Sequence, residues 1–189
     1  MTAARKEEPR IKLKVCLAGE VAVGKTSLIR RYVHDTFDDR YLATMGAKVT
    51  KRVLSLKMPG SKQQGHVDLT IWDIMGDKGV RDLLKEAYFR GSQGILAVCD
   101  VTRPETLPEL QGWRKSVEKV AGKIPAYVLA NKVDLVDEAR LEESEVASFS
   151  QGWGSPYILT SAKTGENVKE AFAGLALMIL ESQLELAKA

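Results

Sequence analysis

Cysteine and histidine are scarce in this sequence, and long apolar runs are absent. It has two cysteines and two histidines. Cys16 and Cys99 fall in apolar segments, so we expect buried reduced thiols, and the isolated His34 and His66 predict no transition-metal site. No apolar run approaches the roughly 18 residues that span a membrane. The segment MTAARKEEPR also lacks the apolar core of a secretory signal, so we expect a cytoplasmic protein.

An excess of one charge is also missing, as are the usual lipidation signals. The formal net charge is +3, and no basic block is dense enough to bind nucleic acid alone, so we expect no nucleic-acid partner. The segment ESQLELAKA has no cysteine for prenylation, and Thr2 stands where myristoylation needs glycine. We therefore expect no direct lipid anchor. We also expect a monomer.

What the sequence does contain is a regular alternation of strand and helix patterns. The predicted strands lie at about 11–18, 48–58, 66–73, 94–101, 126–133 and 156–161. The predicted helices lie at about 25–33, 80–90, 107–120, 141–151 and 168–179. This order predicts an α/β fold with a mainly parallel sheet and helices on both faces. We expect one domain at 10–183, an N-terminal extension at 1–9 and a short tail at 184–189.

Residues 19–27, GEVAVGKTS, lie between the first predicted strand and helix, and they match the P-loop spacing. The glycines let backbone N–H groups turn toward one oxyanion, and the helix N-terminus adds a favourable dipole. Lys25 can reach the outer phosphates, and the Thr26 hydroxyl can bind Mg2+. The flanking strand and helix disfavour an ordinary glycine-rich turn. The predicted phosphate site comprises Gly19, Glu20, Val21, Ala22, Val23, Gly24, Lys25, Thr26 and Ser27.

Two tetrapeptides after the P-loop favour guanine over adenine. NKVD and TSAK each follow a predicted strand. The Asp134 carboxylate can accept from guanine N1–H and the exocyclic amino group, which adenine does not offer there. The Lys132 stem can lie along the purine, and the Ala162 N–H can reach guanine O6. An ATP-dependent kinase or ATPase is the disfavoured alternative. The predicted base-binding residues are Asn131, Lys132, Asp134, Ser161, Ala162 and Lys163.

A third motif, WDIMGD, places Asp73 at the end of a strand and Gly76 three residues later. Asp73 can hold Mg2+, and the Gly76 N–H can face the γ-phosphate. Thr44, in the loop at 35–46, can reach the same metal and phosphate. These two loops would contact only the third phosphate. They would therefore become ordered when a nucleoside triphosphate is bound and be released when the third phosphate is absent.

Together these motifs resemble the small GTPases of the Ras superfamily, most closely the Rab branch, over about residues 10–183. YFRGSQGILAVCDVT and TSAKTGENVKEAF are especially similar to Rab-type segments. The resemblance implies a P-loop NTPase G domain with a six-stranded, mainly parallel sheet and one antiparallel edge strand. It implies binding of GTP and GDP with Mg2+, through metal ligands Thr26, Thr44 and Asp73.

The resemblance also implies roles for residues that the motifs alone do not define. Phe37 would pack edge-on to guanine, and Tyr41 would cover the phosphates. Effector and exchange-factor proteins would bind through switch I (35–46) and switch II (73–82), while Trp72 is either an effector contact or a packing residue. The implied catalytic set is Lys25, Thr44, Gly76 and Asp77.

Three residues depart from the family pattern near the expected γ-phosphate. Switch II reads WDIMGDK where the family usually reads WDTAGQE, so Asp77 replaces the glutamine that orients water. A carboxylate there is electrostatically unfavourable and cannot donate as an amide does. Met75 replaces a small alanine, and Val21 crowds a P-loop position that is glycine in Ras. We therefore predict slow hydrolysis and a poor response to Ras-type or Rab-type activators.

Three alternatives remain open from the sequence. Arg40 can act as an arginine in cis, or a partner can supply a different catalytic apparatus. The alternative function is a non-catalytic GTP-binding scaffold.

Overall fold

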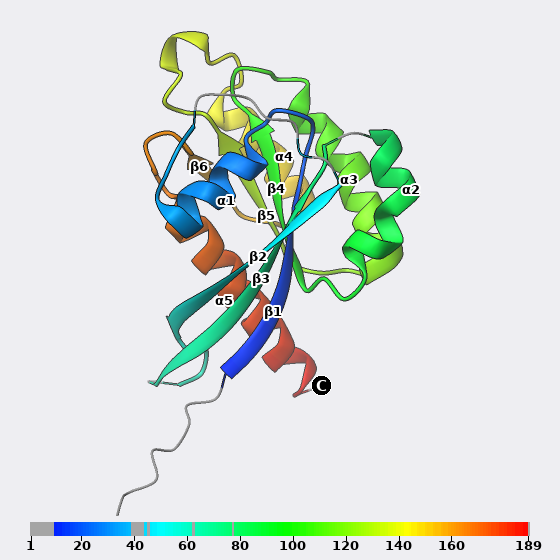
Figure 1. Cartoon of the computed structure of the whole chain (residues 1–189), viewed down its shortest axis with the longest axis vertical. Helices are drawn as coiled ribbons and strands as arrows, with labels where there is room; N and C mark the ends of the chain where they lie inside the picture. The colour runs from blue at the N-terminus through cyan, green and yellow to red at the C-terminus, as the bar shows by residue number, and fades with distance from the viewer. Residues whose placement is uncertain (1–9, 39–43, 45, 62, 77, 189) are drawn as a thin grey trace, which may run out of the picture.

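A six-stranded sheet forms the centre of the fold, with strand order β2-β3-β1-β4-β5-β6 (Figure 1). The structure, a computed structural model, describes residues 10–38, 44, 46–61, 63–76 and 78–188. The strands are β1 (Arg10–Ala18), β2 (Ala47–Lys57), β3 (Gln64–Ile74), β4 (Gly94–Asp100), β5 (Ala126–Asn131) and β6 (Tyr157–Thr160). β2 is antiparallel to β3, and the other pairs are parallel. The predicted mainly parallel sheet with one antiparallel edge strand is confirmed.

Helices cover both faces of this sheet, as predicted. They are α1 (Lys25–His34), α2 (Lys78–Phe89), α3 (Thr106–Ala121), α4 (Glu143–Trp153) and α5 (Val168–Leu186), with a short 3-10 helix η1 (Val136–Glu138). α1 and α5 pack against one face, and α2, α3 and α4 pack against the other. No helix in the described part of the chain is long and apolar enough to cross a membrane.

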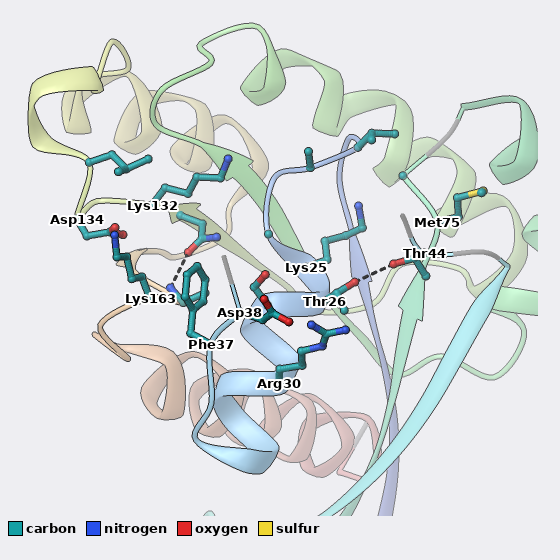
Figure 2. A pocket seen from close by; sticks show the side chains of 18 of the residues that line it. Lys25, Thr26, Arg30, Phe37, Asp38, Thr44, Met75, Lys132, Asp134 and Lys163 are labelled. Carbon is teal, nitrogen blue, oxygen red and sulfur yellow. Dashed lines mark hydrogen bonds between the residues drawn. The ribbon is translucent and has the colours of Figure 1, made fainter. Parts of the chain in front are cut away.

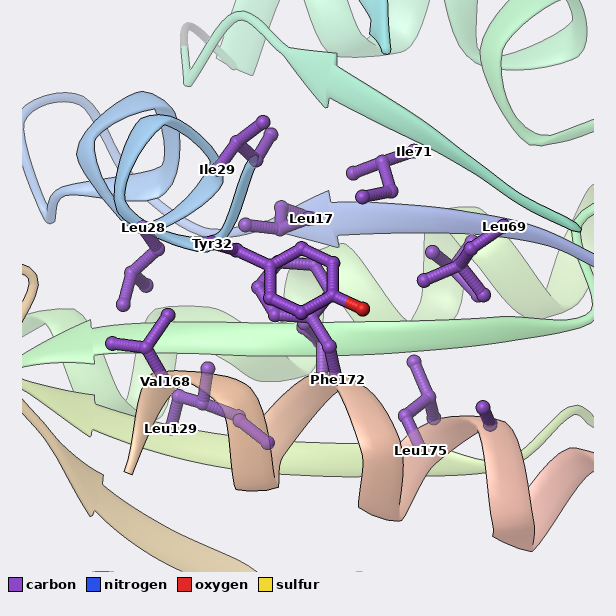
Figure 3. Packing of buried hydrophobic residues seen from close by; sticks show 14 of the residues in the cluster. Leu17, Leu28, Ile29, Tyr32, Leu69, Ile71, Leu129, Val168, Phe172 and Leu175 are labelled. Atoms are coloured by element: carbon purple, nitrogen blue, oxygen red, sulfur yellow. The ribbon is translucent and has the colours of Figure 1, made fainter. Parts of the chain in front are cut away.

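Alternation along β1 explains how one strand contributes to two cores. Leu13, Val15 and Leu17 point toward α1 and α5, whereas Cys16 and Ala18 point toward α2 and α3. In the first core the rings of Tyr32 and Phe172 stack with centroids 4.0 Å apart, which joins α1 to α5 (Figure 3). β4 is buried along its whole length, as its continuous apolar run predicts.

The two cysteines are buried and not bonded to each other, which confirms the expectation of free thiols. Burial raises the pKa of Cys16 to about 11 and that of Cys99 to about 12. Both thiols are therefore protonated and unreactive at neutral pH.

Several helix ends differ from the sequence prediction, and two of these differences have a clear physical cause. α4 begins at Glu143 rather than 141, because the side chains of Glu142 and Glu145 form a reciprocal capping box at its first turn. α5 continues through Leu186, beyond the expected domain end at 183, because no glycine or proline follows Gly174 in this part of the chain.

Candidate functional site

A cavity of about 540 Å³ opens at the carboxyl ends of β1, β3, β5 and β6 (Figure 2). Ligands of open α/β sheets bind at this edge. Figure 2 shows Lys25, Thr26 and Thr44 on one side of the cavity, with Lys132, Asp134 and Lys163 on the other. The predicted site residues that line it are Val21, Ala22, Gly24, Lys25, Thr26, Ser27, Phe37, Thr44, Gly76, Asn131, Lys132, Asp134, Ala162 and Lys163.

The P-loop can take its shape only because two of its residues are glycine. Gly19 has φ of 147°, and a Cβ there would lie 2.2 Å from the Val98 carbonyl oxygen. Gly24 has φ of 100°, and a Cβ there would lie 2.3 Å from Nδ2 of Asn131. Ala22, between them, also has a positive φ of 62°. The loop therefore packs closely against the backbone of β4 and the Asn131 side chain of β5.

Lys25 begins α1 and is 6% exposed at the floor of the P-loop. Its Nζ donates to the carbonyl oxygens of Gly19 at 2.7 Å and Glu20 at 2.8 Å. Burial lowers the pKa of Lys25 to about 8, and the nearby carboxylates of Asp73 and Glu20 offset part of this effect. Glu20 is itself held by Nε1 of Trp113 in α3, at 3.2 Å. A desolvated ammonium group in this place attracts phosphate oxygens strongly.

The three predicted metal ligands converge at one point. Thr26 Oγ1 donates to Asp73 Oδ2 at 2.6 Å and lies 2.8 Å from Thr44 Oγ1. Asp73 Oδ1 is buried and has no hydrogen-bond partner among the described residues. Burial raises the pKa of Asp73, while the Thr26 bond and Lys25 lower it. A set of oxygen atoms with one unsatisfied carboxylate oxygen fits Mg2+.

Gly76 packs directly on the P-loop, next to two departures from the family pattern, Val21 and Met75. A Cβ on Gly76 would lie 2.5 Å from the Val21 backbone nitrogen. Val21 is 41% exposed and, with Met75, lines the cavity at this end. The Met75 N–H donates to the Gly46 carbonyl oxygen at 3.1 Å, so the two switch segments touch here. This end of the cavity therefore has an apolar wall.

At the other end, Asn131 joins the two predicted base motifs to the P-loop. Its Nδ2 donates to the Val23 carbonyl oxygen at 2.9 Å, and its Oδ1 accepts from the Ala162 N–H at 3.2 Å. The Ala162 N–H can thus reach a guanine oxygen only by sharing or exchanging this bond. Asp134 Oδ1 accepts from the Ser161 hydroxyl at 2.6 Å, which orients the carboxylate. In Figure 2 the Phe37 ring lies beside the Lys163 side chain, and both line the cavity.

Sequence reasoning missed a buried network behind the site. Asp100, at the end of β4, is fully buried and accepts from Lys132 Nζ at 2.6 Å and Arg103 Nε at 3.1 Å. Arg103 Nη2 also donates to the Val21 carbonyl oxygen at 2.8 Å. Burial alone would raise the pKa of Asp100, but the bonds from Lys132 and Thr102 outweigh it and lower the pKa. The network joins the P-loop to the lysine of the base motif.

Other cavity residues also lay outside the recognised motifs. Arg30 and Asp38 line the cavity and lie next to each other in Figure 2. Arg31 Nε donates to the Ala162 carbonyl oxygen at 2.9 Å, which fastens the base loop to α1. Helical spacing in α1 predicts which residues face the core, but it does not distinguish a cavity contact from an exposed charge. Ile74 and Leu135 complete the lining.

Three predicted residues cannot be placed. Tyr41, Asp77 and Arg40 lie outside the described residues. Their implied roles, including Asp77 in the glutamine position and Arg40 as an arginine in cis, therefore remain predictions.

The mainly parallel sheet, the P-loop at the end of β1 and the cavity define a P-loop nucleotide-binding protein of the α/β class. Comparison with known proteins narrows this class. The family model described as "Ras: Ras family" matches residues 14–181.

Curated relatives give the same result. Ras-related protein Rab-21 of Geodia cydonium is 33% identical over 181 residues, which is 95% of this chain and 76% of that protein. Ras-related protein Rab-1D of Dictyostelium discoideum is 32% identical over 164 residues, covering 86% of this chain and 77% of that protein. Ras-related protein Rab-13 of Canis lupus familiaris is 32% identical over 168 residues, covering 88% and 79%.

The chain belongs to the Ras family and is a Rab-like small GTPase of the Ras superfamily. Family membership makes it a GTP-binding GTPase switch of a kind that binds GTP and GDP with Mg2+ and works through effector and exchange-factor proteins. The resemblance inferred from the motifs is thereby confirmed.

Proposed function

We propose that this protein is a monomeric guanine-nucleotide switch that hydrolyses GTP slowly and signals mainly through the lifetime of its GTP-bound state. The main support is the convergence of Lys25, Thr26, Thr44 and Asp73 at one end of a cavity whose other end holds Asp134. The phosphate and base halves of a nucleotide site thus lie in one continuous cavity.

At the phosphate end, the chain's own groups bind and orient the triphosphate. Backbone N–H groups of the P-loop and the ammonium group of Lys25 hold the outer phosphates. Thr26, Thr44 and Asp73 would hold Mg2+, which neutralises charge on the phosphate oxygens when it is bound. The Gly76 N–H would donate to the γ-phosphate, since Gly76 lies against the P-loop, where a Cβ would be 2.5 Å from the Val21 backbone nitrogen.

The same end of the cavity supports the proposal of slow hydrolysis. Val21 and Met75 occupy the cavity wall beside Gly76, where an activating side chain from a partner would have to enter. Asp77 follows directly and brings a carboxylate where the family uses an amide. A negative charge close to a triphosphate opposes the charge that develops in the transition state.

Coupling between the switches supplies the signal. From switch I, the Thr44 hydroxyl contacts the Thr26 hydroxyl at the expected metal site. The bond from the Met75 N–H to the Gly46 carbonyl oxygen joins switch II to switch I. Loss of the γ-phosphate removes the contact that holds both segments, so effectors that bind them distinguish GTP from GDP. The alternative, a non-catalytic GTP-binding scaffold, is favoured by the same apolar wall.

Base preference tests the proposal without relying on hydrolysis. We expect GTP and GDP, but not ATP, to displace a fluorescent guanine nucleotide. Asp134→Ala should weaken binding of guanine nucleotides by about 100-fold or more, because two bonds to a charged acceptor are lost. Asp137→Ala, at an exposed residue of η1, is the matched control and should bind as the parent does. Equal binding of ATP and GTP by the parent protein would contradict the proposal.

A further inference from the structure

Among the described residues, no helix covers one face of the sheet near its β2 edge. Apart from Ala47 at the start of β2, which is half-buried, the residues of β2 that point to this side are all exposed: Val49, Lys51, Val53, Ser55 and Lys57. In Figure 1 the lower halves of β1, β2 and β3 face the viewer, and α5 lies behind them. This side is opposite the core that α1 and α5 form.

Strand pairing gathers basic residues on this face that are far apart in the sequence. Lys12 of β1 lies level with Asp68 of β3 and Val53 of β2. Lys14 lies level with Lys51, across Thr70 of β3, in the next row. We call this surface the basic face; its charged residues are Arg10, Lys12, Lys14, Lys51, Lys57 and the single carboxylate of the three strands on this side, Asp68.

The carboxylate of Asp68 offsets only one of the five positive charges. Lys14 is held in place, with Nζ 4.0 Å from the Trp72 ring centroid and donating to the Arg90 carbonyl oxygen at 2.7 Å. The neighbouring Glu86 of α2 is paired with Arg90 at 3.5 Å, so that pair adds no net charge. The basic face therefore carries an excess of positive charge that the net charge of +3 does not reveal.

Apolar side chains lie between these cations. Val49 is 45% exposed and Val53 is 53% exposed, on either side of Lys51 along β2. Exposed apolar residues flanked by lysines are typical of surfaces that rest at the boundary between lipid headgroups and acyl chains. The sheet directs the valines and the lysines to the same side.

We propose that the basic face docks on the surface of an anionic lipid bilayer. Its size favours a bilayer over an acidic protein partner. Three strands about 4.8 Å apart, with a rise of about 3.3 Å per residue, give roughly 400 Å². A protein partner typically covers about 800 Å² on each side. A bilayer has no such minimum, because its attraction increases with each basic residue near the surface.

Docking by this face does not depend on the proposed nucleotide function. None of its charged residues lines the nucleotide cavity. The two proposals can therefore fail separately.

Co-sedimentation of the full GDP-loaded chain with vesicles tests this inference. We expect binding to vesicles of equal parts phosphatidylcholine and phosphatidylserine, and none to phosphatidylcholine alone. Binding should be lost in about 1 M salt, where the screening length is about 3 Å. Lys12→Gln/Lys51→Gln should weaken binding roughly 25-fold, at about fivefold per basic residue removed.

Two variants control for net charge and for folding. Lys115→Gln/Lys119→Gln removes the same charge from exposed positions of α3 and should bind as the parent does. Lys12→Arg/Lys51→Arg keeps the charge and should also bind, and retained GDP binding shows that each variant folds.

Three outcomes would overturn the inference. The parent protein could fail to bind the anionic vesicles at low salt. The α3 variant could lose as much binding as the basic-face variant, which would mean that only net charge matters. Finally, the chain could bind poly-glutamate through Lys12 and Lys51 but not vesicles, which would assign the face to an acidic polypeptide.

Discussion

At the scale of single residues, steric contacts decide which side chains the phosphate loop accepts. A Cβ at Gly19 would lie 2.2 Å from the Val98 carbonyl oxygen, a distance that real Cβ atoms do not adopt. Either the loop or β4 must therefore move when this glycine is replaced.

Gly19→Ala should lower both the free energy of unfolding and the affinity for GDP. We expect a loss of about 2 kcal/mol or more in stability, because the substitution adds backbone overlap to an unfavourable φ. Thermal unfolding with and without GDP measures it. Gly152→Ala is the control, since that glycine lies in α4 with nothing within 4 Å of its Cβ, and it should stabilise by about 0.5–1 kcal/mol. A Gly19→Ala variant as stable as the parent would contradict this geometry.

Site residues whose roles require a fixed spacing along the chain could be predicted from the sequence. Residues whose contacts form only when distant segments come together could not. Lys25 and Thr26 follow from the P-loop pattern, because their roles require adjacent positions at a helix start. Arg103 belongs to no motif, and its bond to the Val21 carbonyl oxygen joins residues that are distant in the chain. Nothing in the local sequence distinguishes it from an ordinary exposed arginine.

At the scale of elements, the turn after β4 connects the two halves of the site. Asp100 binds both Arg103 and Lys132, and Arg103 binds the P-loop. The turn from β4 to α3 therefore holds the phosphate loop and the base loop in a fixed relation.

Arg103→Ala should accelerate release of GDP by about tenfold or more, because it removes two bonds of a charged group that position the P-loop and Lys132. Stopped-flow release of a fluorescent GDP measures the rate. Arg140→Ala, at an exposed loop residue, should release GDP at the parent rate. If Arg103→Ala releases GDP at the parent rate while folding normally, the network has no positioning role.

Element types were easier to predict than element ends. Alternation in β1 and the continuous apolar run of β4 give both strands directly, since side-chain period and burial depend on local sequence. The start of α4 was missed because it depends on a capping pair, Glu142 and Glu145, whose spacing is common on exposed helices as well.

At the scale of the whole molecule, strand order brings distant motifs together. The P-loop follows β1, Asp73 lies near the end of β3, and the base motifs follow β5 and β6, so parallel strands bring all four to one edge of the sheet. The sequence predicted this edge because parallel strands share one direction. It did not predict the basic face, because a search along the chain finds blocks of charge and not the register of β1 against β3 and β2.

The central claim is that Asp77 and Val21 make this GTPase slow. Single-turnover hydrolysis of GTP-loaded protein with Mg2+ tests it most directly, comparing the parent with Asp77→Gln, Val21→Gly and the double variant. We predict a nearly inert parent and faster hydrolysis in the variants, most of all in the double variant. Fast hydrolysis by the parent that Asp77→Gln slows would contradict the claim and show that the carboxylate takes part in the reaction.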